Sequence, residues 1–327
     1  MTGAAEKVNL LGMPKAKLEA FFETLGEKRF RAQQVLQWMH QRGVDDFDQM
    51  TNMSKALREK LKQVAEIRGP EVVYDETSKD GTRKWVMRMD NGNSVETVLI
   101  PDGERGTLCV SSQVGCAYGC KFCASGLDGF TRNLVADEIA GQVLLAEQLS
   151  GEKVNNIVFM GMGEPLANLP HLLKAFELIT SPWGLGIGAR HLTVSTSGLA
   201  PQIQKLADHP QQIRLAISLH GASDEVRNRI MPVNRKWPVS ELFDALHYWK
   251  SRKKQKLTLE YILIEGVNDD LTQAALLARS AKSLQAKVNL IPYNRVEGLS
   301  WKRPSESHCR EFRNTVMEEG VATTLRL

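Results

Sequence analysis

The feature of the sequence that most constrains its fold is a run of cysteines around residue 120. Four of the five cysteines lie within fifteen residues, at Cys109, Cys116, Cys120 and Cys123. The last three have the spacing C-x3-C-x2-C, and glycines interrupt the run. Three thiolates in a short glycine-containing loop can enclose one site for a soft metal. Because four cysteines normally complete a [4Fe–4S] site, this loop leaves one iron free to bind a substrate or a cofactor.

The residues alone leave two other interpretations of the run open, a zinc site and a set of structural thiols. Zinc sites usually pair two Cys or His ligands with two more elsewhere in the chain, and no second pair follows here. Disulfide frameworks are typical of small secreted domains, whereas this chain has 327 residues and clustered cysteines. The spacing therefore favours an iron–sulfur cluster.

Residues 1–70 predict a small helical domain. Apolar residues fall on one face of each of three successive helices, the first beginning near Pro14. Lysines and arginines cover the remaining surface, which predicts either a solvated helix surface or an RNA-binding appendage. Gly69-Pro70 ends this segment. Residues 71–106 then predict β structure, with strong hairpin turns at Asp80-Gly81 and Asn91-Gly92.

From residue 107 onward, short apolar strands alternate with amphipathic helices. We expect strands at 107–111, 154–160, 191–195, 213–218, 257–263 and 287–291. We expect helices at 133–149, 169–179, 201–207, 240–250, 272–284 and 305–318. This alternation predicts a parallel α/β fold, and six units fall short of the eight that close a TIM barrel. Ligand sites of such folds gather at the carboxyl ends of the strands.

Polar and glycine-rich words follow directly after four of these strands. The residues concerned are Gly163 and Glu164, then Ser195, then Ser218, Leu219 and His220, and last Asn294. Glycine allows a close approach of the backbone to a ligand, and a glutamate accepts hydrogen bonds from an ammonium group. Each word has a plainer alternative: a turn at 161–165, a helix cap at Ser195, and a zinc ligand or acid–base role for His220.

The loop 224–236 is rich in cations, among them Arg227 and Arg229. Cations at the mouth of an open barrel suit contacts to phosphates. The alternative is a surface loop in which the cations pair with neighbouring carboxylates.

The words around these positions resemble the RlmN/Cfr family of radical S-adenosylmethionine (SAM) RNA adenine methyltransferases. The resemblance is carried by LCVSSQVGC, KFCASG, FMGMGEPLANL, LTVSTSGL, LAISLHGASDEVRNRIMPVNRKWP, LEYILIEGVND and VNLIPYN, and it runs from about Leu10 to the last residue. It implies an open (β/α)6 partial TIM barrel, the radical SAM core, over residues 107–327. It also implies an RNA-binding accessory domain over 1–70 and a β extension or linker over 71–106.

The resemblance implies two cofactors, a [4Fe–4S] cluster and SAM. Cys116, Cys120 and Cys123 would hold the cluster. The residues expected to bind SAM are Gly163, Glu164, Ser195, Ser218, Leu219, His220 and Asn294; Asn289 is an alternative to the last of these.

The implied reaction methylates carbon 2 of an adenine in 23S rRNA, with tRNA as a further substrate of the family. One SAM methylates a cysteine, and the second is cleaved at the cluster to a radical that activates that methyl group. Glu96 matches the family's proton acceptor, and Cys109 matches the cysteine that resolves the protein–RNA thioether. The alternatives are a glutamate that faces solvent and a buried strand cysteine.

In the family, the cysteine that carries the methyl group lies in a C-terminal tail, in a word resembling AACG. The sequence stops at ATTLRL, where that tail is expected to begin, and Cys309 in SHCREF does not match. We therefore assign no methyl carrier from the sequence. Two interpretations stay open: a methyltransferase, or a truncated or repurposed paralogue that binds SAM and RNA or cleaves SAM without methyl transfer.

Composition bounds the partners and the compartment. The net charge of +4 permits an RNA partner without requiring one. No apolar run approaches the about 20 residues of a membrane helix, and the first residues lack a signal-peptide pattern. Clustered free cysteines fit a reducing cytoplasm. We expect a cytoplasmic monomer, without membrane contact, that receives electrons from a reductase or a flavodoxin-type donor, as the resemblance implies.

Overall fold

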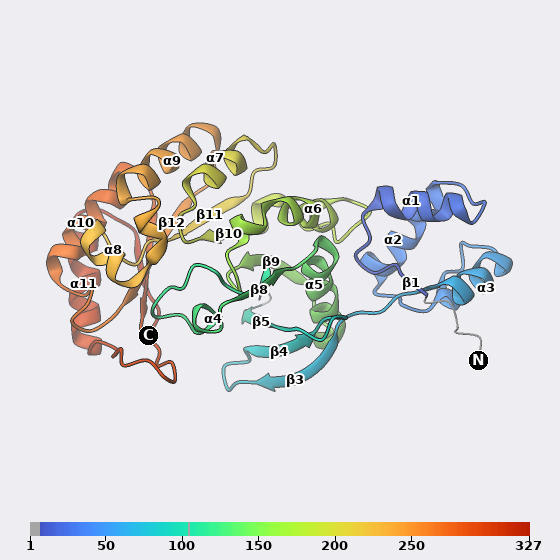
Figure 1. Cartoon of the computed structure of the whole chain (residues 1–327), viewed down its shortest axis with the longest axis horizontal. Coiled ribbons are helices and arrows are strands. Elements are labelled where there is room, and N and C mark those ends of the chain that lie inside the picture. Colours follow the sequence, from blue (N-terminus) through green and yellow to red (C-terminus); the bar gives the residue numbers. More distant parts are fainter. Residues whose placement is uncertain (1–6, 104) are drawn as a thin grey trace. The chain divides into compact units, whose positions relative to one another are not determined.

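The computed structural model describes residues 7–103 and 105–327, which fall into two compact units. Unit 1 consists of Met1–Ser112, Asn133–Gly161 and Pro170–His191. Unit 2 consists of Gln113–Arg132, Met162–Leu169 and Leu192–Leu327. Figure 1 labels the helices and strands of both.

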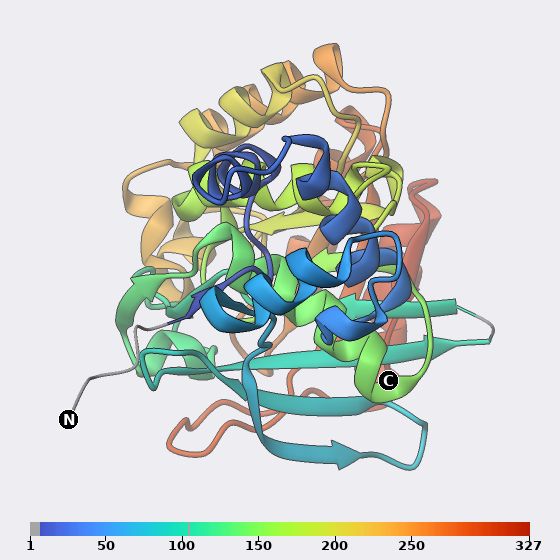
Figure 2. The same ribbon diagram turned by 90° about the vertical axis from the view of Figure 1, so that its right-hand side faces the viewer.

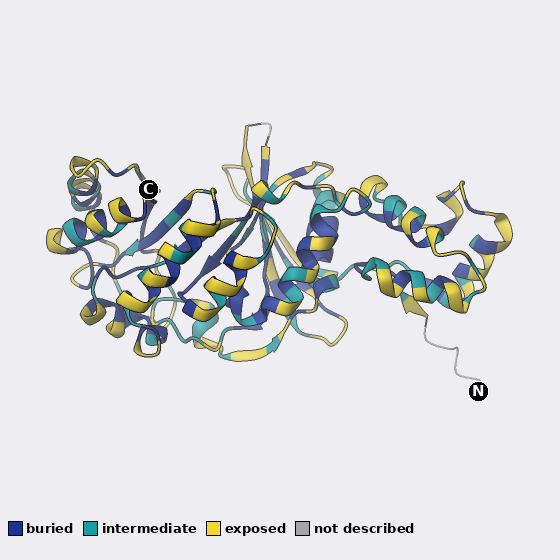
Figure 3. Cartoon of the chain, turned by 90° about the horizontal axis from the view of Figure 1, so that it is seen from above, coloured by how far each residue is buried: buried dark blue, intermediate teal, exposed yellow. Residues whose placement is uncertain are grey.

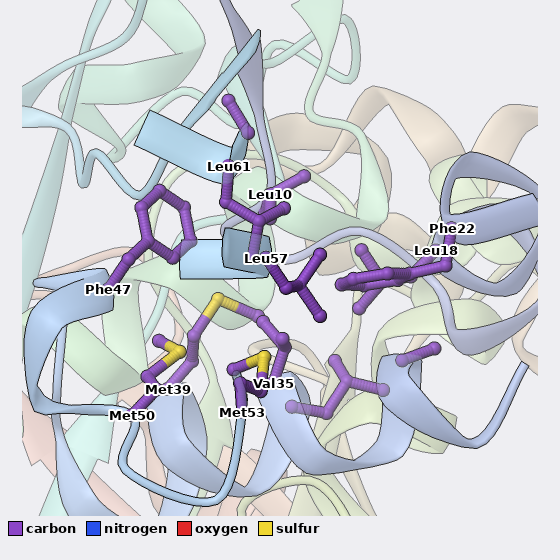
Figure 4. Close-up of a cluster of buried hydrophobic side chains, with 13 residues drawn as sticks. Leu10, Leu18, Phe22, Val35, Met39, Phe47, Met50, Met53, Leu57 and Leu61 are labelled. Carbon is purple, nitrogen blue, oxygen red and sulfur yellow. The ribbon is translucent and has the colours of Figure 1, made fainter. Parts of the chain in front are cut away.

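Unit 1 begins with the three expected helices, α1 (Lys15–Thr24), α2 (Phe30–Arg42) and α3 (Lys55–Val64). Their apolar faces meet in one core, and Figure 4 shows side chains from all three helices converging there. The short strands β1 (Val8–Asn9) and β2 (Ala65–Glu66) pair in parallel and bring the two ends of this segment together. The three helices expected in this segment are present within residues 7–70.

Three antiparallel strands follow, as the turn chemistry predicts: β3 (Glu71–Thr77), β4 (Arg83–Arg88) and β5 (Ser94–Asp102). Gly81 and Gly92 have φ angles of 85° and 84°. These left-handed conformations favour glycine. The β extension therefore forms where it was expected.

The first βα unit of unit 1 joins this antiparallel sheet to a parallel pair. Strand β5 pairs antiparallel with β6 (Arg105–Cys109), and β6 pairs in parallel with β9 (Val154–Phe159). Helix α5 (Ala136–Ser150) packs on β5 and β9 and lies across the teal strands in Figure 2. Its buried Gln142 donates to Ser111 O and accepts from Ser111 N and Thr97 Oγ1, each at 2.9 Å. These bonds satisfy buried backbone groups where β6 ends.

Unit 2 contains an all-parallel sheet whose strands follow one another in chain order. The strands are β10 (Leu192–Thr196), β11 (Arg214–Ser218), β12 (Leu257–Leu263), β13 (Lys287–Pro292) and β14 (Thr323–Leu325). The intervening helices are α7 (Ala200–Asp208), α9 (Val239–Arg252), α10 (Leu271–Ser283) and α11 (Glu306–Glu318). Figure 3 shows helices with buried and exposed faces beside buried strands, the amphipathic pattern expected of a parallel sheet.

Several short elements of unit 2 were not predicted. Strand β14 extends the sheet by only three residues, too few for a recognisable pattern. The loop 224–236 contains helix α8 (Asp224–Ile230) and the 3-10 turn η4 (Pro232–Arg235). Ser223 caps α8 by accepting from Val226 N at 3.4 Å. Arg227 is fully buried in this segment, so both surface interpretations of it are wrong.

No helix within residues 7–103 and 105–327 has the length and apolar character needed to cross a membrane.

Candidate functional site

The cysteine run forms an anchored loop in unit 2. Strands β7 (Gln113–Gly115) and β8 (Phe130–Asn133) pair at its base, and the short helix α4 (Ala124–Leu127) follows the third cysteine. Cys116 N donates to Gly129 O at 2.8 Å and closes the loop. A Cβ at residue 115 would lie 1.8 Å from that same oxygen, and Gly115 has a φ of 69°, so only glycine fits.

Three further contacts hold the tip of the loop. Lys121 N donates to Ile230 O at 2.9 Å, and Trp301 Nε1 donates to Lys121 O at 3.0 Å. The ring of Phe122 meets the His220 ring edge to face, with centroids 4.9 Å apart. The loop that carries Cys116, Cys120 and Cys123 is therefore tied to α8, to β11 and to the segment after β13.

The three thiols are free, half-buried and close enough to act on one another electrostatically. Burial, and then the neighbouring Cys123, Cys116 and Glu164, raise the pKa of Cys120 to about 12, while the charge of Arg227 acts in the opposite direction. Burial likewise raises the pKa of Cys116. Thiolates at this site therefore need compensating positive charge, which a metal supplies as it displaces the protons.

Within residues 7–103 and 105–327, no group of three Cys, His, Asp or Glu side chains is arranged to hold a single metal ion. A tetrahedral zinc site draws all its ligands to one ion, whereas in a [4Fe–4S] cluster each thiolate binds a different iron.

Glu164 is a buried carboxylate in the segment that follows strand β9, and it belongs to unit 2. Its Oε1 accepts from Leu166 N at 3.0 Å, and its Oε2 accepts from Ser197 N at 2.7 Å and from Ser197 Oγ at 2.8 Å. Burial raises the pKa of Glu164, and the bonds from Ser197 and Leu166 oppose that effect. The side chain of Thr196 also lowers the pKa of Glu164 by hydrogen bonding, so several donors from the end of β10 and from the segment after Glu164 hold the carboxylate in place.

The backbone beside Glu164 allows a close approach. Gly163 has a φ of 99°, and a Cβ there would lie 2.5 Å from Gln113 Cβ. Glu164 N donates to Gln113 Oε1 at 2.7 Å, which ties this word to β7 at the base of the cysteine loop. Gly163 and Glu164 therefore lie beside the base of the cysteine loop.

Serines line the ends of β10 and β11. Ser195 Oγ and Ser218 Oγ are 3.4 Å apart, and both side chains are largely buried. The sequence missed Ser197, whose hydroxyl and amide both bind Glu164. The word TSG indicates that a hydroxyl group lies here. The sequence pattern does not show that this hydroxyl reaches Glu164, which lies 33 positions away in the chain.

His220 has a structural environment rather than that of a metal ligand. Its Nδ1 accepts from Ile262 N at 3.0 Å, so Nε2 carries the proton of the neutral ring. Burial, with the charge of Arg227, lowers the pKa of His220 to about 3. Its φ is 54°, and Asn268 Nδ2 donates to its carbonyl oxygen at 2.7 Å. The word 218–220 therefore presents a fixed backbone, and the histidine supports Phe122.

Asn294 lies just beyond β13 and is exposed, and its Oδ1 accepts from Arg303 Nη1 at 3.2 Å. The alternative, Asn289, is buried within β13, where its Nδ2 donates to Glu260 Oε2 at 2.6 Å and its Oδ1 accepts from Thr324 Oγ1 at 2.8 Å. Asn294 is thus the asparagine with a surface that a ligand can reach.

Glu96 and Cys109 lie in unit 1, on the adjacent strands β5 and β6. Val98 is the register partner of Cys109, so Glu96 is a diagonal neighbour on the same face of the sheet. Glu96 is exposed and its Oε1 lies 3.5 Å from Lys84 Nζ. Burial, with a smaller contribution from Glu96, raises the pKa of Cys109 to about 11. The geometry brings a protonated thiol near an accessible carboxylate.

The fifth cysteine lies elsewhere. Cys309 is fully buried on α11, where its thiol faces Pro304 O at 3.9 Å. Burial raises its pKa. A thiol in this position is a packing residue.

Comparison with known proteins agrees with this geometry. Residues 8–67 match the model of the ribosomal RNA large subunit methyltransferase N-terminal domain, and residues 110–278 match the radical SAM superfamily. A protein of Marinobacter nauticus named dual-specificity RNA methyltransferase RlmN is 60% identical over 334 residues, which cover 100% of this chain and 90% of that protein. A protein of Akkermansia muciniphila, named probable dual-specificity RNA methyltransferase RlmN, is 55% identical over 318 residues. The match covers 95% of this chain and 89% of that protein.

The fold comparison gives the same result. The crystal structure of a radical SAM methyltransferase from Sphaerobacter thermophilus has a TM-score of 0.92 and 38% identity, covering 98% of this chain and 95% of that chain. The radical SAM superfamily uses a [4Fe–4S] cluster and SAM, and the anchored three-thiol loop beside Glu164 fits both. The chain therefore belongs to the RlmN family of radical SAM methyltransferases.

Proposed function

We propose that this enzyme methylates carbon 2 of an adenine in 23S rRNA, and of an adenine in tRNA as a second substrate. The observation that carries the proposal is the anchored loop of three thiols beside the buried carboxylate of Glu164. The relatives' name, dual-specificity RNA methyltransferase, supports RNA as the substrate.

In this proposal Cys116, Cys120 and Cys123 would hold the cluster, which would supply one electron for the reductive cleavage of SAM. Glu164 would accept a hydrogen bond from the SAM ammonium group. Its orientation is fixed beforehand by Leu166 and Ser197, so little ordering is required on binding. Gly163 allows the ligand to approach the backbone.

The remaining SAM contacts come from the ends of three strands. Ser195 and Ser218 offer two hydroxyls 3.4 Å apart, which suit a ligand with adjacent hydroxyl groups. Leu219 and His220 contribute a fixed backbone, and Asn294 contributes an exposed amide beyond β13.

Cys109 and Glu96 complete the reaction in the proposal. The Cys109 thiol, with its pKa raised to about 11, is protonated at neutral pH and cannot react until it loses that proton. Glu96 is an exposed carboxylate on the adjacent strand, and it is the proton acceptor we assign for the adenine.

The proposal extends to domains and partners. We assign RNA binding to residues 1–70, a linking β extension to 71–106, and catalysis to the barrel of residues 107–327. We further propose a cytoplasmic monomer that is reduced by a reductase or a flavodoxin-type donor. The net charge of +4 supports contact with RNA phosphates.

A second candidate function is SAM cleavage without methyl transfer. Cys309 does not distinguish the candidates as a methyl carrier, because its buried thiol has no surface at which a methyl group could be delivered. The two candidates share the cluster and the SAM site and differ only in the product on RNA.

Anaerobic turnover separates the candidates. The chain is reconstituted with iron and sulfide and incubated with SAM, dithionite and protein-free rRNA, and Cys116→Ala serves as the control. We expect mass spectrometry to detect 5′-deoxyadenosine and 2-methyladenosine together, and neither with the variant. 5′-Deoxyadenosine alone would favour the second candidate, and 8-methyladenosine would correct the position. A wild-type protein that holds iron and sulfide yet forms no product would overturn both.

A further inference from the structure

Arg227 is a buried cation whose direct partners are all neutral oxygens. It lies on α8, and no part of the residue is exposed. Its Nε donates to Leu219 O at 3.0 Å and its Nη1 donates to Asn234 Oδ1 at 2.8 Å. Its Nη2 donates to Ser197 O and, at 3.5 Å, to Ser218 O. Every bond of the guanidinium therefore goes to a carbonyl or amide group, at the ends of β10 and β11 and at η4.

These bonds satisfy the guanidinium donors but leave its charge uncompensated. No carboxylate of the described residues forms an ion pair with Arg227. Burial lowers its pKa to about 10, which still leaves it charged at neutral pH. Cys120 and then Asp224 act to raise the pKa of Arg227, and Asp224 is an exposed residue that accepts from Asn234 Nδ2 at 2.7 Å. Buried charges without a counter-charge are costly and therefore rare, so a negative group is expected nearby.

The cysteine loop is the neighbour that can supply this negative charge. Lys121 N donates to Ile230 O in the last turn of α8, one turn beyond Arg227. The charge of Arg227 also lowers the pKa of the Cys120 thiol, against the larger effect of burial. Three thiolates around a [4Fe–4S]2+ core leave a net negative charge, and reduction by one electron increases it.

We propose that Arg227 is the buried counter-charge of the cluster and raises its reduction potential. The proposal rests on the cluster assigned to this loop. One electron passes from a low-potential one-electron reductant to the 2+ core, no bond forms or breaks, and the guanidinium keeps its proton. Because the product of this step is more negative, a fixed cation beside it stabilises the reduced form over the oxidised form. Arg227 thus acts on the cluster through its charge and contacts neither substrate nor iron.

The same side chain links the cluster environment to the SAM site. The carbonyl of Ser197 accepts from Arg227, while the amide and hydroxyl of Ser197 donate to Glu164. A substitution of Arg227 therefore has a structural effect as well as an electrostatic one, and the test needs variants that separate the two.

Three variants of the reconstituted chain make this separation. Arg227→Gln removes the charge and keeps some hydrogen bonding, Arg227→Lys keeps the charge, and Arg229→Gln removes an equal charge from the exposed face of the same helix. Iron content is measured first, and the midpoint potential is then measured by an anaerobic redox titration followed by electron paramagnetic resonance. Iron content of the wild-type protein tests the cluster assignment separately.

We expect Arg227→Gln to lower the ratio of reduced to oxidised cluster about tenfold at a given potential, which is about 59 mV for a one-electron couple. Nearby charges in buried sites change equilibria by this factor or more. Arg227→Lys and Arg229→Gln should match the wild-type potential closely. If Arg227→Gln loses the cluster while Arg227→Lys retains it, the charge is needed for assembly, which also supports the proposal. An unchanged potential in Arg227→Gln, or loss of the cluster in both variants of Arg227, would overturn it in favour of a purely structural role.

Discussion

Replacing His40 with leucine should remove a large part of the acid sensitivity of the N-terminal helices. His40 lies on α2 and is 2% exposed, and neither ring nitrogen has a hydrogen-bond partner among the described residues. Burial lowers its pKa from 6.5 to about 4. The unfolded chain binds a proton more readily than the folded chain between these values, so stability is lost as the pH falls from 6.5 toward 4.

The magnitude follows from the two pKa values. At about 1.36 kcal/mol for each pKa unit, the difference between 6.5 and about 4 corresponds to about 3 kcal/mol of unfolding free energy. Between pH 7 and pH 5 the same linkage predicts a loss of about 2 kcal/mol. His40→Leu abolishes this contribution and, because it removes two unpaired buried nitrogens, should be at least as stable as the wild type at pH 7.

Urea denaturation at pH 7 and pH 5 measures the effect, with hydrogen exchange of peptides from α1 to α3 to localise it. His247→Leu, at an exposed histidine of α9, is the matched control and should retain the wild-type pH dependence. If the wild type and His40→Leu lose the same stability between pH 7 and pH 5, the reasoning from burial is refuted.

Three predictions concern the site. Glu164→Gln should weaken SAM binding at least about tenfold in titration calorimetry, because the amide keeps one acceptor oxygen for three protein donors and loses the charge that an ammonium group requires; unchanged affinity in a folded variant would contradict the assignment. Phe122→Ala should lose iron on gel filtration while the melting temperature of the apo chain changes little, since the ring supports the loop through His220; equal iron retention would count against this. Cys109→Ala should still form 5′-deoxyadenosine but release less methylated RNA than the wild type, and normal release of methylated RNA would exclude its proposed role.

The sequence predicts those elements whose periodicity is long enough to be distinctive. The strand expected at 257–263 corresponds to β12 (Leu257–Leu263), and the helix expected at 272–284 differs from α10 (Leu271–Ser283) by one residue at each end. Strand β14 and helix α8 were not predicted. The three residues of β14 depend on tertiary packing, and the seven residues of α8 depend on a single cap. Short elements carry too few residues for a period to be recognised.

The site was predictable where spacing or a local word carries the chemistry. The three cysteines follow from their spacing, and Gly163 follows from a turn that only glycine permits. The burial of Arg227 was not predictable, because charged residues are almost always exposed and its partners come from three separate segments. The same holds for Ser197, whose bond to Glu164 is made only when β10 is in place.

The anchoring of the cysteine loop has a consequence for how the cluster is assembled. Gly129, Ile230, Trp301 and His220 restrain the loop through bonds and a ring contact that involve no metal. The conformational entropy of the loop is therefore lost when the chain folds and not when iron arrives. Small zinc domains behave in the opposite way, since metal binding and folding are one event in them. In this chain a folded apoprotein can serve as the template, and repeated loss and rebuilding of the cluster need not pass through an unfolded state.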